Sequence, residues 1–89
     1  MHTCKIFLDN NIKIAYMQQY ELIQLGERIK ALRLKKGLTI SAMCYRNALE
    51  PSTISRVEAG IVDVKYLTLV KIAKALEVKL EELLNFDKL

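Results

Sequence analysis

The sequence has few of the residues that build disulfide scaffolds, metal sites and hydrolytic sites. It contains two cysteines, one histidine and no tryptophan in 89 residues. Cys4 and Cys44 are too few for a disulfide scaffold, and they lack the spacing of metal ligands. His2 is the single histidine, which argues against a zinc site or a histidine-based triad. We therefore expect no metal ion and no cofactor.

Long apolar runs are also missing. No run approaches 18 residues, the length from which a membrane-spanning helix is inferred, and the first residues lack the long apolar segment of a signal peptide. The sequence therefore predicts a cytoplasmic protein that does not contact a membrane. The carboxylates of Glu81 and Glu82 stand at adjacent helical positions that face different directions, so we expect solvated surface here rather than an enzyme's acid and base.

Positive charge exceeds negative charge only modestly. Fourteen Lys and Arg residues against ten Asp and Glu residues give a net charge of +4, which permits nucleic-acid binding without requiring it. The hydrophobic fraction is 52%, more than a single chain of this size comfortably buries. Some of that apolar surface is therefore expected to meet a second subunit.

The first 17 residues differ in pattern from the rest. Residues 5–8 and 12–16 are short β-prone runs, and Asp9, Asn10 and Asn11 between them suit a turn. A hairpin or a single paired strand is one interpretation, although an isolated hairpin is barely stable and needs a partner surface. The other interpretation takes Met17 as the natural first residue. We divide the chain into an N-terminal extension, 1–17, and a folded domain, 18–89.

From Gln18 onward the apolar spacing becomes helical and predicts five short helices. The first ends at Gly37, the second begins after Thr39 as N-cap, and the third begins at Pro51 and ends at Gly60. Asp63 is the expected cap of the fourth helix, and the last helix is expected at 80–84. The prediction is an all-α bundle, with the N-terminal extension as its one candidate for β structure.

Residues 39–60 carry the pattern of a helix-turn-helix. Two short helices flank a four-residue turn, and apolar anchors hold them at a fixed angle; the anchors are Met43, Leu49, Ile54 and Val57. The outer face of the second helix is left free to enter a major groove of DNA.

The sequence resembles the lambda-repressor-like, Cro/C1-type (Xre) family of bacterial and phage regulators. The resemblance covers about 25–84, and three segments in order carry it: Leu-Gly-Glu-Arg-Ile-Lys at 25–30, Ser-Thr-Ile-Ser-Arg-Val-Glu-Ala-Gly at 52–60, and Leu-Val-Lys-Ile-Ala-Lys-Ala-Leu at 69–76. It implies a five-helix bundle that binds double-stranded DNA.

The family's contacts fall on particular residues of this chain. The resemblance implies that bases are read from the third helix, by Pro51, Ser52, Thr53, Ser55 and Arg56. It also implies that phosphates are held at the start of the second helix and before the fourth, by Thr39, Ile40, Ser41, Lys65 and Tyr66. It implies in addition a buried structural ion pair between Arg33 and Glu58.

Four positions depart from the family pattern. Ile40 replaces a glutamine that clamps a phosphate, and Glu50 replaces a small polar cap with a charge that repels phosphate. Pro51 has no hydrogen-bonding side chain, and Ala48 stands where a glycine commonly accommodates a positive φ. These departures weaken the expected DNA contacts and leave the expected fold unaffected.

The leading functional hypothesis is a sequence-specific transcriptional regulator, a repressor that binds a palindromic operator as a homodimer. Arg56 is its expected main base reader, with bidentate contacts to guanine. Dimerisation is expected through residues 83–89 or through an intersubunit sheet of residues 6–8 or 12–16. The alternative is an antitoxin-type or adaptor protein, in which the same fold mainly holds a protein partner such as a toxin.

Overall fold

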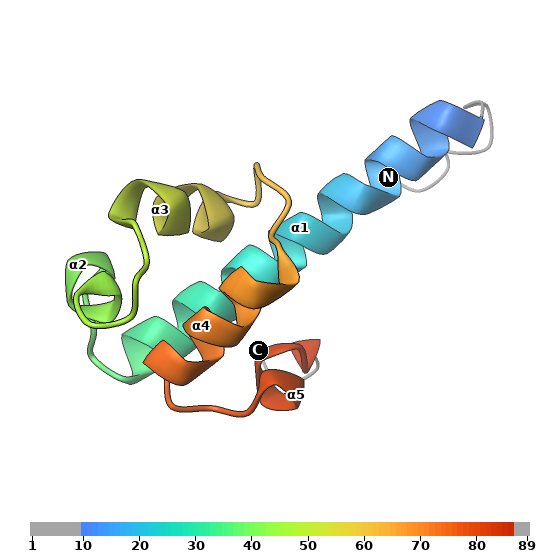
Figure 1. Cartoon of the computed structure of the whole chain (residues 1–89). Coiled ribbons are helices and arrows are strands. Elements are labelled where there is room, and N and C mark those ends of the chain that lie inside the picture. Colours follow the sequence, from blue (N-terminus) through green and yellow to red (C-terminus); the bar gives the residue numbers. More distant parts are fainter. Residues whose placement is uncertain (1–9, 87–89) are drawn as a thin grey trace.

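The computed structural model describes residues 10–86 of the chain, with side chains from residue 19 onward, and helices are the only regular secondary structure within them (Figure 1). The helices are α1 (Asn10–Lys35), α2 (Ile40–Cys44), α3 (Pro51–Ala59), α4 (Tyr66–Ala75) and α5 (Leu80–Leu83). Five helices and the all-α class confirm the prediction from apolar spacing. No helix in this described part is long and apolar enough to span a bilayer.

The long helix α1 packs against α3 and α5, while α2 packs on α3 and α4 packs on α5 (Figure 1). The core positions of α1 follow one another at helical spacing, so one stripe of α1 faces inward. The buried apolar residues come from all five helices and include residue 76 just past α4; they are Leu25, Ile29, Leu32, Met43, Cys44, Ile54, Val57, Ile72, Ala73, Leu76 and Leu83. A single core therefore fixes α2 and α3 relative to α1.

Helix ends follow the sequence signals in most places. Gly37 and Gly60 adopt positive φ values of +71° and +75°, the left-handed conformation in which glycine commonly ends a helix. The Thr39 hydroxyl accepts a hydrogen bond from the Ala42 N–H at 3.0 Å, which confirms the predicted N-cap of α2.

After α1, two helix boundaries differ from the prediction. Asp63 does not cap α4, because its carboxylate accepts a hydrogen bond from the adjacent Val64 N–H while α4 begins at Tyr66, with Lys65 as N-cap. Asp63 is three residues before the helix, too far to reach its first free N–H groups. The last helix, α5, ends at Leu83, one residue earlier than predicted.

In the N-terminal extension the structure corrects one prediction from the sequence. Residues 12–16 lie within α1, so the β-strand considered there is wrong; residues 5–8 lie outside the described residues. No proline or glycine interrupts residues 10–25, so the helix anchored by Leu25 and Ile29 continues toward the N-terminus. An intersubunit sheet of residues 12–16 is excluded for the same reason. The division at residues 17 and 18, which α1 crosses, stays a prediction.

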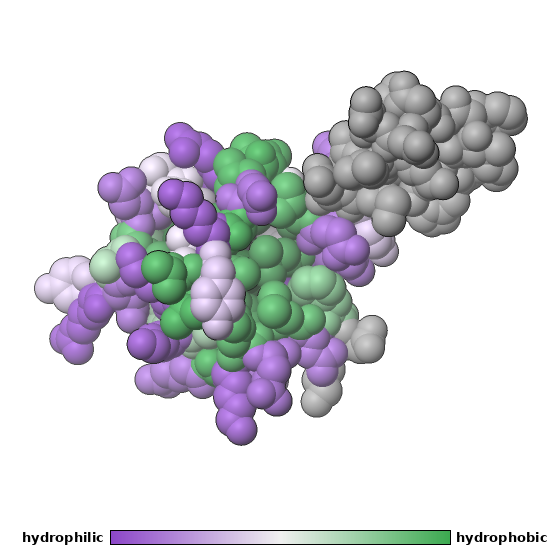
Figure 2. All heavy atoms as spheres, turned by 45° about the vertical axis from the view of Figure 1, so that its right-hand side comes forward, coloured by the Kyte–Doolittle hydropathy of each residue, from purple (hydrophilic) through white to green (hydrophobic). Residues whose placement is uncertain are grey.

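Several large apolar side chains remain exposed outside the core. They are Tyr20, Ile23, Leu34, Tyr45, Ile61, Tyr66, Leu67 and Leu84. Figure 2 shows hydrophobic atoms gathered among hydrophilic ones on one face of the domain. Leu83, by contrast, is fully buried, so it is not available for the dimer contact expected of residues 83–89.

Candidate nucleic-acid interface

Helices α2 and α3 form the helix-turn-helix that the sequence predicts. Met43 in α2 and Ile54 and Val57 in α3 are buried, and Leu49 in the turn packs against the same core. Because the anchors point inward, the opposite side of α3 faces solvent. The structure thus supplies a short, rigidly mounted helix with a free outer face, the shape that enters a major groove.

The turn between α2 and α3 contains a strained residue. Ala48 has φ +54°, as expected from its glycine-like position. A positive φ is energetically unfavourable for alanine, because its Cβ atom comes too close to the following carbonyl oxygen. Asn47 does not adopt a positive φ; its side-chain amide donates to the Met43 carbonyl at 2.8 Å. This bond satisfies a free carbonyl at the end of α2.

Replacing Ala48 by glycine is expected to raise the free energy of unfolding by about 0.5–1 kcal/mol, because glycine relieves the strain at positive φ and offsets part of that gain through unfolded-state entropy. Urea denaturation measures the change. Ala31→Gly is the matched control: Ala31 is exposed within α1, and glycine there should cost about 1 kcal/mol. A loss of stability in both variants would contradict the assignment of strain to Ala48.

The residues expected to read bases are not equivalent in the structure. Pro51, Ser52, Ser55 and Arg56 are exposed on α3, whereas Thr53 is half-buried. Thr53 lines a groove between α3 and the segment leading into α4, whose other walls are Val57, Asp63, Val64, Lys65 and Thr68. The outer face is therefore made by two serines and one arginine, with Pro51 at the start of the helix.

The residues expected to hold phosphates also differ in their exposure to solvent. Ser41, Lys65 and Tyr66 are exposed, while the Ile40 side chain packs against the core. The Thr39 hydroxyl is engaged in capping α2. At Ile40 the backbone N–H is therefore the group left for a phosphate, and the DNA roles of all these residues stay predictions.

Asp63 lies beside the predicted phosphate contact Lys65, whereas the sequence reasoning assigned it only to capping. Its carboxylate is exposed in the groove that Lys65 also lines. A negative charge here would oppose the phosphate contact that is predicted for Lys65. The signal available in the sequence was the alternation of charge in Asp-Val-Lys at 63–65.

A buried ion pair holds α3 against α1. Arg33 Nε lies 2.7 Å from Glu58 Oε2, and Arg33 Nη2 donates to Glu58 Oε1 at 3.0 Å, so the pair is bidentate. The two side chains are only 9% and 7% exposed. The hydrogen bonds from Arg33 to Glu58 raise the pKa of the guanidinium, against an opposing effect of burial.

The same arginine also fixes the beginning of the helix-turn-helix. Its Nη1 donates to the Leu38 carbonyl at 2.7 Å, in the segment that leads into α2. Arg33 therefore joins the end of α1, the entry to α2 and the end of α3. The structural pair implied by the family resemblance is present in this chain.

A second buried arginine was not singled out from the sequence. Arg28 donates from Nη2 to the Glu82 carbonyl at 2.8 Å and from Nε to the same oxygen at 3.3 Å, which fastens α5 to α1. Its position between Leu25 and Leu32 at core spacing was the available signal. The bond satisfies a carbonyl near the end of a one-turn helix.

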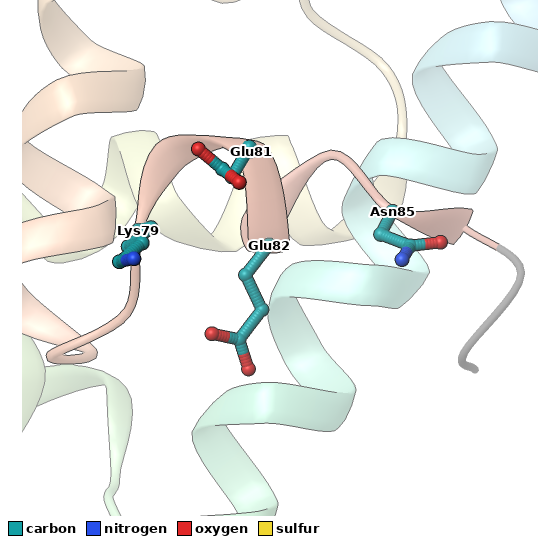
Figure 3. A pocket seen from close by; sticks show the side chains of 4 residues that line it. All are labelled: Lys79, Glu81, Glu82 and Asn85. Atoms are coloured by element: carbon teal, nitrogen blue, oxygen red, sulfur yellow. The ribbon is translucent and has the colours of Figure 1, made fainter.

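The surface beside α5 is polar. Lys79, Glu81, Glu82 and Asn85 line a pocket there, and Figure 3 shows the two glutamate side chains pointing in different directions. Within the described residues no group of three histidine, cysteine, aspartate or glutamate side chains could hold a metal ion. The exposed face of α3 is therefore the candidate site that the structure supports best.

Comparisons with known proteins bear on this site. Residues 24–86 match a family described as "Helix-turn-helix domain". The restriction-modification controller protein C.AhdI from Aeromonas hydrophila is 31% identical in sequence over an alignment that covers 72% of this chain and 97% of that one, with a TM-score of 0.69. The clp gene regulator ClgR from C. glutamicum shares the fold, at 22% identity, 76% and 88% coverage and a TM-score of 0.70.

A search of curated proteins gives no match. The family match nevertheless spans most of the chain and includes α2, α3 and the ion pair that joins α3 to α1. The chain therefore belongs to the lambda-repressor-like, Cro/C1-type helix-turn-helix family of DNA-binding regulators.

Proposed function

We propose that the protein is a repressor that binds a palindromic operator as a homodimer. The observation that carries the proposal is the outer face of α3, where Ser52, Ser55 and Arg56 are exposed while Ile54 and Val57 anchor the helix in the core. A helix mounted in this way presents a few side chains to base edges in a fixed register.

The small number of these contacts supports a dimer. Ser52 and Ser55 are short, and Pro51 offers no hydrogen bond, so one domain reads few base pairs. Two copies on one duplex double the contacts, and a two-fold axis relates two half-sites about one helical turn apart. The similarity to a controller protein and a gene regulator supports a role in gene control.

Selection of bound DNA from a random pool, at a stated salt concentration, tests this function. The expected result is an enriched palindrome with two half-sites whose centres are about 10 base pairs apart, or a multiple of that distance. Reporter expression from a promoter overlapping that site should fall when the protein is present. A pool without enrichment, together with a protein partner that co-purifies, would instead support the antitoxin-type alternative.

Arg56→Ala is expected to weaken binding to the selected operator by about 1–3 kcal/mol per half-site and to relax the preference at one base pair, because Arg56 is the one long donor on the outer face of α3. Repeating the selection with the variant measures both effects. The contradicting result is an unchanged base preference.

Lys65→Ala is the matched control for Arg56, since Lys65 is an exposed cation of similar reach outside α3. It should weaken all sequences alike and reduce the dependence of binding on salt, as expected for a phosphate contact. The pair of variants thus separates base reading from charge attraction.

A further inference from the structure

The residue at the entry to α3 carries a carboxylate. Glu50 is the N-cap of α3, with φ −102° and ψ 130°, so the chain is still extended there and the helix begins at Pro51. Figure 1 shows the chain entering α3 at the outer edge of the domain. In a helix-turn-helix the N-terminal residues of the second helix are the ones that contact base edges. Glu50 therefore stands at the end of α3 that is aimed at a major groove.

The Glu50 carboxylate makes no contact that the fold requires. An N-cap side chain usually accepts a hydrogen bond from the second or third N–H of its helix, but Glu50 makes no such bond. Among the residues whose side chains the structure describes, no lysine or arginine forms an ion pair with it. The side chain is also exposed. Both carboxylate oxygens are therefore available to a partner outside the domain.

Cytosine is the part of a DNA duplex that suits this carboxylate best. Phosphates repel it, and in the major groove guanine and thymine present acceptors rather than donors. Adenine presents an amino donor, but the N7 acceptor beside it opposes the second carboxylate oxygen. Cytosine presents its N4 amino group alone, and a glutamate or aspartate is the side chain that accepts from it.

The neighbouring residues on α3 leave this role to Glu50. Pro51 has no side-chain donor or acceptor, and the Ser52 hydroxyl is on a short side chain. Arg56 lies farther along α3, roughly 8 Å of helix rise beyond Pro51. Since base pairs are stacked about 3.4 Å apart, Glu50 and Arg56 face different base pairs.

We propose that Glu50 is a second base-reading residue, whose carboxylate accepts a hydrogen bond from the N4 amino group of a cytosine in the major groove. The proposal rests on the proposed function, to which it adds one residue and one base beyond the guanine contact of Arg56. The charge that opposes phosphate binding then acts as a source of specificity. On a duplex without the amino group, the carboxylate loses its water and faces only acceptors, which penalises the wrong sequence.

Selection of bound DNA from a random pool, carried out with the native chain and two variants, tests the proposal. The native chain is expected to enrich a cytosine at one position of a half-site, apart from the guanine read by Arg56. Glu50→Ala should lose that preference, on the order of 10-fold, and keep the guanine. Glu50→Gln should replace the cytosine by adenine, because a glutamine amide pairs with the N6 and N7 atoms of adenine.

Fluorescence anisotropy measures the same contact directly. Two duplexes are compared that differ only at the selected position, which is C·G in one and T·A in the other. The native chain should bind the T·A duplex on the order of 10-fold more weakly, whereas Glu50→Ala should bind both alike. Circular dichroism should show a native fold for Glu50→Ala, since the side chain makes no bond within the domain.

Two other carboxylates serve as controls. Asp63→Asn removes a charge from the groove beside α3, while its amide oxygen can still accept the Val64 N–H. This variant should strengthen binding to all sequences alike and change no base preference. Glu81→Gln, on the exposed side of α5, should change neither affinity nor preference. If Glu50→Ala behaves as Asp63→Asn does, Glu50 only repels phosphates and the proposal is overturned.

The selected sequences separate this proposal from the proposed function. If the native chain enriches single half-sites whose cytosine is lost with Glu50→Ala, Glu50 reads a base although the palindrome hypothesis fails. If the native chain and Glu50→Ala enrich the same palindrome with every base preference unchanged, the operator hypothesis stands and Glu50 is not a base reader. A native chain without a preference at any position would overturn both.

Discussion

Gly26→Ala is expected to destabilise the domain by about 2 kcal/mol and to lower its melting temperature by roughly 8–16 °C. Gly26 lies in α1 where the end of α3 crosses closest. An added Cβ would collide with the Val57 carbonyl oxygen and lie 2.7 Å from the Glu58 carbonyl oxygen. Both are backbone atoms, so the helices must separate, and the gain in helix propensity from alanine offsets only part of the cost.

The same substitution should also weaken operator binding of the folded protein. Val57 and Glu58 belong to α3, so separation of the helices shifts the face that carries Arg56. Thermal unfolding by circular dichroism measures the stability, and fluorescence anisotropy with operator DNA at low temperature measures binding.

Gly37→Ala is the matched control for Gly26. Nothing lies within 4 Å of a Cβ added there, while φ is +71°. Alanine at Gly37 should therefore cost stability through backbone strain alone, on the order of 1 kcal/mol, and leave the position of α3 and the DNA affinity unchanged. Gly26→Ala with native stability would show that α1 and α3 can absorb the added methyl group without loss.

Much of the fold could be predicted because its signals are local. Helical spacing of Leu25, Ile29 and Leu32 identifies the core face of α1, and Gly37 and Thr39 mark its end and the start of the next helix. The start of α1 could not be predicted in this way. Residues 12–16 are β-prone in isolation, and their helical state depends on continuation from the anchored part of α1.

The candidate site was predictable to a different degree at each position. Exposure of Ser52, Ser55 and Arg56 follows from the burial of Ile54 and Val57 on the opposite side of α3. Thr53 could not be separated from them by spacing, because its half-burial depends on where the segment before α4 lies. The burial of Thr53 is therefore determined by contacts between segments that are distant in the sequence.

Two interactions between distant residues show the same limit. The approach of α3 to Gly26 and the bond from Arg28 to the Glu82 carbonyl each join segments far apart in the chain. No pattern within one helix encodes such a contact. Arg28 could be placed on the inner side of α1 by spacing, but its acceptor depends on how α5 packs.

Glu58→Ala is expected to cost about 3–5 kcal/mol of the free energy of unfolding, because it leaves the buried Arg33 guanidinium without its carboxylate. The total free energy of unfolding of a domain of this size is little larger than this loss, so much of the variant should be unfolded at 37 °C. Urea denaturation at low temperature measures the loss, and it should be nearly independent of salt, since the native pair is buried.

The double variant Arg33→Met with Glu58→Leu decides what the pair contributes. Removing both charges leaves no unpaired ion, so stability should recover toward the native value even though the pair is absent. Lys36→Ala is the surface control: the Lys36–Glu77 pair spans 3.9 Å between exposed side chains, and its loss should change stability by less than about 1 kcal/mol.

If the double variant regains stability yet binds operator weakly, the pair acts mainly by orienting α3, because the packing is restored while the bidentate link from α1 is not. If the double variant remains as unstable as Glu58→Ala, the loss arises from packing around residue 58 or from the lost bond between Arg33 and the Leu38 carbonyl, rather than from an unpaired charge.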